Sequence, residues 1–177
     1  GSVGVEVDEK GVPRYDIRED VAWDHIPFTP RLEELARHTQ AVCFGSLAQR
    51  HSASRSTISN SSTPCRRKRD GKIFDINLRQ NFYTPEILLS SLQRCNILKI
   101  NDEELDIISR IFGLPDTGVQ KKCHGMLEKY DLKALILTCG TQGSFVFTPD
   151  DTSFQNTPKV EVADTVGAGD SFTAAFT

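Results

Sequence analysis

Residues 164–170 read Asp-Thr-Val-Gly-Ala-Gly-Asp and place small residues directly before an acidic residue. An extended segment at 159–163 precedes them and an apolar run at 171–176 follows, which predicts a turn from extended chain into a helix. Backbone N–H groups of small residues at such a turn can converge on one anion. Asp170 is expected in the first helical turn, where the helix dipole favours its ionised form.

A carboxylate beside an anion site suits the transfer of a phosphoryl group to an alcohol. The carboxylate accepts the hydroxyl proton, and the amides stabilise the charge on the phosphoryl group. We therefore predict that Asp170 is a catalytic base. The predicted anion hole consists of the amides of Gly167, Ala168 and Gly169. The residues alone leave a second interpretation open, in which the glycines form an ordinary turn and Asp170 only serves the helix end.

The composition is that of a globular protein with one sizeable core. The chain has 177 residues, of which 38% are hydrophobic and 25% charged, and its net charge is -3. No apolar run approaches the ~18 residues of a membrane span. We therefore expect neither nucleic acid nor a membrane as a partner. Neither zinc-site nor disulfide spacing links the five cysteines, which predicts a reducing, cytoplasmic location.

Two alternating stretches near the N-terminus predict an antiparallel hairpin with one solvated face. Residues 3–7 alternate valine with glycine or acidic residues, turn residues follow at 8–11, and a second stretch runs over 12–17. Pro27 and Pro30 then interrupt regular structure, and a helix is predicted to begin near Pro30.

The rest of the sequence alternates short apolar runs with helical patterns. Strands are predicted at 41–45, 72–77, 96–100 and 134–138, and helices at 49–60, 85–94, 102–112 and 117–130. Repeated strand–helix–strand units imply an α/β fold with a mainly parallel sheet and helices on both faces. Ligands of such folds bind at the carboxyl ends of the strands, so functional residues are expected directly after each strand.

Polar residues do follow the second and third of these strands. Arg79 presents a planar fork that suits phosphate oxygens, with Asn77 close by, although on the residues alone a solvated or structurally paired arginine is the simpler interpretation. Asn101 and Glu104 have the spacing of a capping box for the helix at 102–112.

The fourth strand is followed by Thr138, Gly140 and Gly143, which allow a hydroxyl and the backbone to approach a phosphate closely. A plain turn into the alternating stretch at 144–147 is the alternative.

Residues 50–72 hold seven basic residues and one acidic residue, and the basic residues are concentrated at 66–69. Such a run can contact nucleic acid, but its Ser-rich and Gly-containing flanks predict a solvated loop.

Four of these motifs occur in the order of one enzyme family. Residues 164–176 resemble the C-terminal signature of the ribokinase-like (pfkB-type) carbohydrate kinases. The patterns Asp-x-Asn-x-Arg at 75–79, Asn-x-x-Glu at 101–104 and Thr-x-Gly-x-x-Gly at 138–143 resemble its other motifs. The pattern at 75–79, together with Val-Ala-Trp-Asp at 21–24, is most similar to the sequences of bacterial fructokinases. The resemblance implies a ribokinase-like three-layer αβα fold with a mainly parallel central sheet and a small β-lid hairpin.

The resemblance also implies ATP-dependent phosphorylation of a sugar hydroxymethyl group, with fructose as the first candidate. It implies that the nucleotide and its metal are bound by Asn77, Arg79, Asn101, Glu104, Thr138, Gly140 and Gly143. It implies Mg²⁺ held through water at Glu104 and K⁺ at Asp164 and Thr165. Alternatives are a kinase for ribose, 2-keto-3-deoxygluconate, inosine or aminoimidazole riboside, or a non-catalytic regulator that binds sugar or nucleotide.

Finally, the resemblance implies a domain division and an assembly. Residues 1–20 are expected to form part of the β-lid, and residues 21–177 an incomplete kinase domain. A homodimer joined through the lid is expected. Since family members are longer than this chain, we expect both ends to be truncated and the chain alone to be inactive or poorly folded.

Overall fold

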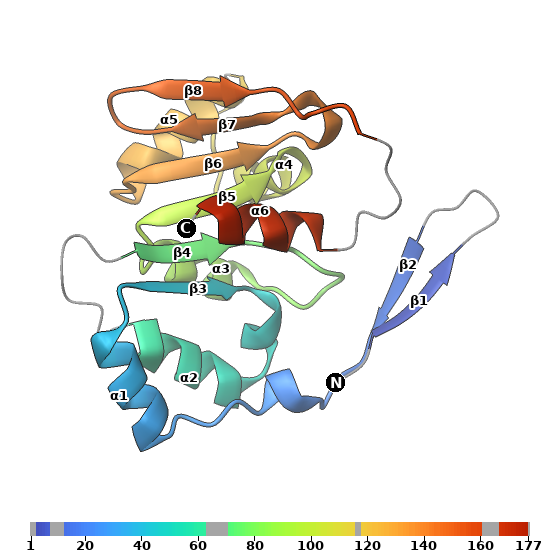
Figure 1. Ribbon diagram of the computed structural model, residues 1–177, viewed down its shortest axis with the longest axis vertical. Coiled ribbons are helices and arrows are strands. Elements are labelled where there is room, and N and C mark those ends of the chain that lie inside the picture. The colour runs from blue at the N-terminus through green and yellow to red at the C-terminus, as the bar shows by residue number, and fades with distance from the viewer. Residues whose placement is uncertain (1–2, 8–12, 63–70, 116–117, 161–166, 177) are drawn as a thin grey trace.

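Alternating apolar runs and helical patterns produce an alternating order of strands and helices (Figure 1). The computed structural model describes residues 3–7, 13–62, 71–115, 118–160 and 167–176. The elements are β1 (Val3–Val7), β2 (Pro13–Ile17), η1 (Ala22–Asp24), α1 (Pro30–His38), β3 (Ala41–Gly45), η2 (Leu47–Arg50), α2 (Ser52–Ser62), β4 (Gly71–Asp75), α3 (Pro85–Leu92), β5 (Ile97–Asn101), α4 (Asp102–Ile111), α5 (Val119–Lys129), β6 (Ala134–Thr138), η3 (Gly140–Gln142), β7 (Ser144–Phe147), β8 (Thr152–Gln155) and α6 (Ala168–Phe176). Within these described ranges, no helix is both long enough and apolar enough to cross a bilayer.

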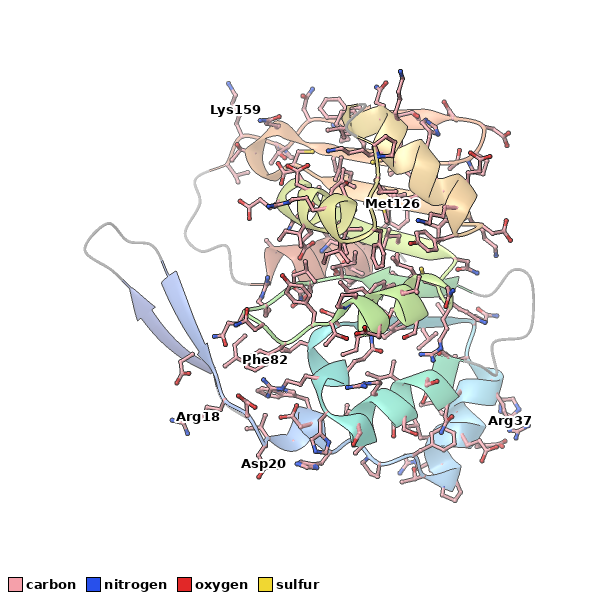
Figure 2. All side chains as sticks on the ribbon, turned by 180° about the vertical axis from the view of Figure 1, so that it is seen from behind. Arg18, Asp20, Arg37, Phe82, Met126 and Lys159 are labelled. Carbon is pink, nitrogen blue, oxygen red and sulfur yellow. The ribbon has the colours of Figure 1, made fainter. Side chains whose placement is uncertain are left out.

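The main sheet has the strand order β3-β4-β5-β6-β7-β8, and β3 to β6 are parallel. β7 and β8 are added antiparallel, because the short turns before them leave no room for a crossover helix. α6 lies on one face of the sheet, and α3, α4 and α5 lie on the other, as Figures 1 and 2 show together. The predicted α/β architecture with a mainly parallel sheet is confirmed.

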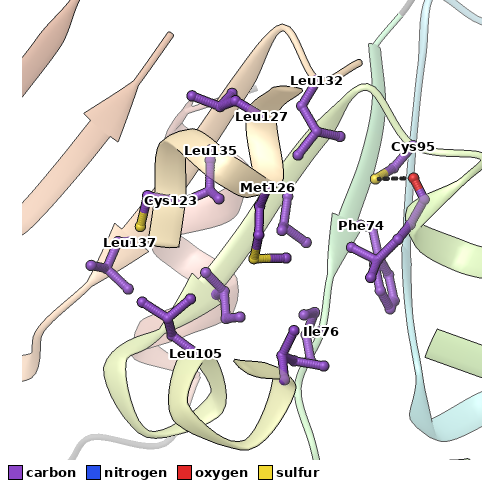
Figure 3. Close-up of a cluster of buried hydrophobic side chains, with 14 of the residues drawn as sticks. Phe74, Ile76, Cys95, Leu105, Cys123, Met126, Leu127, Leu132, Leu135 and Leu137 are labelled. Atoms are coloured by element: carbon purple, nitrogen blue, oxygen red, sulfur yellow. Dashed lines mark hydrogen bonds between the residues drawn. The ribbon is translucent and has the colours of Figure 1, made fainter. Parts of the chain in front are cut away.

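The core lies between the central strands and the helices α3, α4 and α5. Figure 3 shows side chains of β4, β6, α4 and α5 gathered there. Phe74, Leu105, Met126 and Leu135 are at most 1% exposed. Burying an apolar side chain of this size contributes about 1.5–3 kcal/mol, so this cluster fixes the helices on the sheet.

Two helices begin at the same short signal, a threonine followed by proline. Thr29 Oγ1 accepts a hydrogen bond from the Leu32 N–H at 3.2 Å, and Thr84 Oγ1 accepts one from the Ile87 N–H at 3.3 Å. Proline suits the first helical position because it lacks an N–H that would go unpaired there. The prediction of a helix beginning near Pro30 is confirmed.

The predicted strands at 41–45 and 134–138 match residue for residue, whereas the strands and helices predicted between residues 49 and 130 differ from the structure at one or both ends. The strand predicted at 72–77 ends at Asp75, and Asn77 takes a left-handed conformation with φ of 50°. The helix predicted from residue 49 begins at Ser52, because residues 47–50 form the 3₁₀ turn η2. The basic run at 66–69 and residues 161–163 lie outside the described residues.

β1 and β2 pair as the predicted antiparallel hairpin, with Val3 opposite Ile17. The pair forms a two-stranded sheet separate from the main sheet and projects from its side (Figure 1). Figure 2 shows Arg18, Asp20 and Phe82 near the base of this hairpin.

A buried ion pair fixes the segment that joins the hairpin to the main body. Arg50 Nε and Nη2 donate hydrogen bonds to the two Asp24 carboxylate oxygens at 2.7 and 2.8 Å. Arg50 Nη2 also donates to the Arg18 carbonyl at 2.6 Å, and the guanidinium lies over the Phe82 ring. The side chains of Arg50 and Asp24 are only 8% and 2% exposed. The hydrogen bonds from Arg50 lower the pKa of Asp24 from 3.8 to about 2, against the opposing effect of burial.

We expect Asp24→Asn to lower the free energy of unfolding near neutral pH by about 3 kcal/mol, because it leaves the Arg50 charge buried without its partner. The folded-state pKa of Asp24 is depressed, so this contribution is present above pH 3.8 and is lost as the pH falls toward 2. Urea unfolding followed by circular dichroism, from pH 7 down to the lowest pH at which the protein stays folded, measures it.

Asp20→Asn is the matched control, because the Asp20 side chain is 88% exposed and its partner is the half-exposed His25. The control is expected to change stability by less than about 1 kcal/mol. A difference between wild type and Asp24→Asn that stays constant as the pH falls would contradict the prediction.

Candidate functional site

A cavity of about 580 Å³ lies at the carboxyl ends of β5 and β6, the region where the sequence predicts ligand binding. This volume is within the range of small-molecule sites. The lining comes from the start of α4, the turn after β6, the segment after β8 and the start of α6. Its residues are Asn101, Asp102, Glu103, Thr138, Gly140, Gly143, Ser144, Gln155, Asn156, Thr157, Pro158, Ala168, Gly169 and Phe172.

The start of α4 is held by the predicted capping box, which is confirmed. Asn101 Oδ1 accepts a hydrogen bond from the Glu104 N–H at 2.7 Å, and Glu104 Oε2 accepts one from the Asn101 N–H at 3.1 Å. Glu104 Oε1 also accepts from the Leu78 N–H at 2.8 Å, so this carboxyl joins the segments that follow β4 and β5. Burial raises the pKa of Glu104, and the two backbone hydrogen bonds partly offset that effect. Asn101 lines the cavity, and Glu104 supports it from the buried side.

The turn after β6 forms the opposite wall, where β8 packs closely against it. Gly143 has φ of 136°, and a Cβ there would lie 2.3 Å from the Gln155 carbonyl oxygen and 2.9 Å from two Phe154 ring carbons. Thr157 Oγ1 donates a hydrogen bond to the Gly140 carbonyl at 2.8 Å. Thr138, Gly140 and Gly143 therefore share one wall with the segment after β8.

The start of α6 closes the cavity. The Ser171 N–H donates to the Gly167 carbonyl at 2.9 Å, so the helical hydrogen bonds begin there. Helix geometry leaves the N–H groups of Ala168, Gly169 and Asp170 without an acceptor inside the helix. Ala168 and Gly169 line the cavity, and Asp170 is exposed in the first turn as predicted. The proposed K⁺ residues Asp164 and Thr165 lie outside the described residues.

The structure brings together only part of the predicted site. The predicted residues that line the cavity are Asn101, Thr138, Gly140, Gly143, Ala168 and Gly169. The predicted residues that the structure describes outside the cavity lining are Asn77, Arg79, Glu104, Gly167 and Asp170. Arg79 is exposed and donates a hydrogen bond to the Leu78 carbonyl at 3.0 Å. The nucleotide role of Asn77 and Arg79 stays a prediction.

Sequence reasoning missed two parts of the lining. Asp102 and Glu103 are carboxylates at the start of α4, and the acidic run after Asn101 was a signal that could have identified them. The segment Gln155 to Pro158 reaches the cavity only because β8 pairs with β7. Its sequence gives no sign of that long-range contact.

The lining suits an anion that is bound together with a divalent cation. The start of α6 supplies N–H groups for phosphate oxygens, whereas the N–H groups of Asn101, Glu103 and Glu104 at the start of α4 already donate to side chains. In the described part of the chain, the lining side chains include two carboxylates and no Lys or Arg. Mg²⁺ is commonly held by one or two carboxylates together with substrate phosphates. In the described ranges, no cluster of three or more His, Cys, Asp or Glu residues could hold a metal by itself.

A mainly parallel α/β sheet with a ligand cavity at its strand ends defines the class of fold, and sequence comparison identifies the family. Residues 22–177 match the sequence model of the pfkB family carbohydrate kinases. The chain belongs to this family.

Curated relatives include phosphofructokinases and fructokinases. An ATP-dependent 6-phosphofructokinase of Thermoanaerobacterium thermosaccharolyticum is 31% identical over 160 residues, which cover 86% of this chain and 47% of that protein. Putative fructokinase-8 of Arabidopsis thaliana is 32% identical over 108 residues, which cover 58% of this chain and 49% of that protein. The chain spans about half the length of these two relatives.

Solved structures of sugar kinases share the fold. An uncharacterized sugar kinase of Pyrococcus horikoshii superposes with a TM-score of 0.76 at 22% identity, covering 98% of this chain and 54% of that chain. A fructokinase of Vibrio cholerae superposes with a TM-score of 0.73 at 20% identity, covering 97% of this chain and 58% of that chain. The ribokinase-like fold implied by the sequence motifs is confirmed.

We expect Gly143→Ala to lower the free energy of unfolding by about 3 kcal/mol, because the added Cβ adds overpacking against β8 to the cost of the left-handed backbone. Gly140→Ala is the matched control, since Gly140 has φ of 52° but nothing within 4 Å of its Cβ position. This control should cost about 1 kcal/mol. Chemical denaturation of both variants measures the difference, and equal losses would show that β8 does not constrain this wall.

Proposed function

We propose that the protein containing this chain transfers a phosphoryl group from ATP to a hydroxymethyl group of a sugar, with fructose to fructose 6-phosphate as the first candidate. The observation that carries the proposal is the cavity at the strand ends, which Ala168 and Gly169 of the Gly-Ala-Gly-Asp sequence line at the start of α6. Membership of the pfkB family supports carbohydrate phosphorylation. The Vibrio cholerae fructokinase has been solved with fructose, ADP and calcium, and the Pyrococcus horikoshii kinase with ATP.

In the proposed mechanism, Asp170 is the general base. Its carboxylate lies in the first turn of α6, orients the sugar hydroxyl and accepts its proton as the oxygen attacks the terminal phosphorus and the bond from that phosphorus to ADP breaks. The N–H groups of Gly167, Ala168 and Gly169 donate hydrogen bonds to the phosphoryl oxygens as charge develops on them. This chemistry depends on backbone groups that the start of α6 presents together.

The walls of the cavity hold the nucleotide in this proposal. Asn101, Thr138, Gly140 and Gly143 contact it, and Asn77 and Arg79 approach its phosphates. Asp102 and Glu103 are the lining carboxylates that would hold Mg²⁺, which neutralises phosphate charge when bound. Both Glu104 oxygens accept backbone hydrogen bonds, so Glu104 holds Asn101 in place, and its predicted contact with Mg²⁺ is made through water. In this proposal, Asp164 and Thr165 bind K⁺.

The remaining proposals concern the whole protein. Residues 1–20 contribute to a lid over the sugar, and residues 21–177 form part of the kinase domain. The projecting hairpin supports a homodimer joined through the lid, since its strands can pair with a second copy. The free thiols of Cys43, Cys95, Cys123 and Cys139 support a reducing compartment such as the cytoplasm.

In the full-length protein, Asp170→Asn is expected to lower kcat for sugar phosphorylation about 10²–10⁴-fold, because an amide cannot accept the hydroxyl proton. A coupled assay of ADP release in the presence of MgATP and fructose measures it. Glu86→Gln is the matched control, since Glu86 is also an exposed acid in a first helical turn and lies in α3. An undiminished rate in Asp170→Asn would overturn the mechanism.

The acceptor is tested with a substrate panel. We expect the full-length protein to have its highest kcat/KM with fructose among fructose, ribose, 2-keto-3-deoxygluconate, inosine and aminoimidazole riboside. A higher kcat/KM with another compound of the panel would identify that compound as the substrate in place of fructose. Binding of sugar and ATP without turnover would replace the enzyme by a regulator of the same fold.

A further inference from the structure

A buried ion pair lies behind the start of α6, outside the lining of the cavity. Lys99 Nζ donates hydrogen bonds to both oxygens of Asp75 at 3.0 Å. The two residues are direct partners in the pairing of β4 with β5, and their side chains are only 11% and 9% exposed. Charges this deeply buried need well-made hydrogen bonds to offset their desolvation. Asp75 is the first residue of the Asp-x-Asn-x-Arg pattern, and no role has been assigned to it above.

α6 is joined to this pair through one side chain. Thr173 Oγ1 lies 2.9 Å from Asp75 Oδ2 and 3.0 Å from the Gly169 carbonyl. The hydroxyl has one hydrogen to donate, and the charged carboxylate is the stronger acceptor. Thr173 is 6% exposed and is the buried residue of α6. This contact therefore holds the helix to the sheet at a defined depth.

Gly169 shows how closely the helix approaches. A Cβ at Gly169 would lie 3.2 Å from Lys99 Nζ, tighter than nearly all such contacts. The ammonium group thus lies directly behind the helical turn that carries the predicted anion hole. A cation at a helix start is unfavourable by itself, and Asp75 offsets its charge. The absence of a side chain at Gly169 lets α6 settle onto the ion pair.

We propose that Asp75 and Thr173 are positioning residues: together with Lys99 they fix the depth of α6 on the sheet, and so place Gly169 in the lining of the cavity and set the position of Asp170, the next residue of the helix. The catalytic part of this inference rests on the proposed function, whereas the anchoring of α6 does not. A role confined to overall stability would leave the local behaviour of α6 and the reaction rate unchanged.

The test uses Thr173→Val in the full-length protein, because Asp75→Asn would strand the Lys99 charge and risks unfolding. Thr173→Ser retains the hydroxyl and serves as the conservative variant. Thr57→Val is the matched control, since Thr57 is also buried and its hydroxyl donates to the Ile26 carbonyl at 2.7 Å, away from the cavity.

Hydrogen–deuterium exchange of peptides that cover 168–176 reports the anchoring without any substrate. We expect Thr173→Val to accelerate exchange in α6 about tenfold or more, because a buried hydrogen bond to a charged acceptor is lost. Thr173→Ser should stay close to wild type, and Thr57→Val should leave α6 unchanged. Wild-type exchange in Thr173→Val would overturn the inference.

Kinetics with MgATP and fructose test the catalytic part. We expect kcat of Thr173→Val to fall about tenfold to hundredfold with little change in KM, because a misplaced base slows the reaction more than binding. Thr173→Ser should restore kcat. Faster exchange in α6 with an unchanged kcat would overturn the positioning role. If the wild type phosphorylates no sugar on the panel, the proposed function fails, and the exchange experiment alone decides whether α6 is anchored by Thr173.

Discussion

The structure depends on the register of the parallel strands β4, β5 and β6. Phe74 pairs with Leu98 and Leu98 with Leu135, and all three side chains are fully buried. A shift by one residue would move these side chains to the opposite face, so packing fixes the pairing. The same register places Asn101 directly opposite Thr138 at the ends of their strands. The cavity is thus a consequence of how the apolar core packs, with the polar residues carried to one edge.

Buried carboxylates near the cavity are the second constraint, and those of Glu104 and Asp75 both have specific partners. The two oxygens of Glu104 meet two backbone N–H groups, and the two oxygens of Asp75 meet Lys99 and Thr173. Without such partners these groups would cost more free energy than the surrounding apolar contacts supply. The Leu78–Glu104 bond joins the segments that follow β4 and β5, and the Thr173–Asp75 bond joins α6 to β4, so satisfying these groups also fixes the segments around the cavity relative to one another.

Local patterns in the sequence predicted local structure well. The strand at 134–138 and the capping box at Asn101 follow from short-range periodicity and spacing, and both are confirmed. The missed features that have no local signal are long-range. Thr173 meets Asp75 across 98 positions of sequence, and the segment after β8 reaches the cavity through strand pairing. Neither contact leaves a local pattern, because the chain's folding alone brings these residues together.

The charges around the cavity explain why backbone groups carry its chemistry. Among its described lining residues, the ionised side chains are Asp102 and Glu103, which repel a phosphate. The attraction therefore has to come from the start of α6, from a cation bound with the nucleotide, and from Lys99 behind Gly169. N–H groups stabilise an anion only at short range and only when several of them lie close together. Phosphate binding therefore depends more on the small residues at the start of α6, and on the depth of α6 on the sheet, than on the identity of any basic side chain. Asp75 pairs with Lys99, whose charged group lies behind the start of α6. The ion pair therefore contributes to the electrostatics of the cavity as well as to its support.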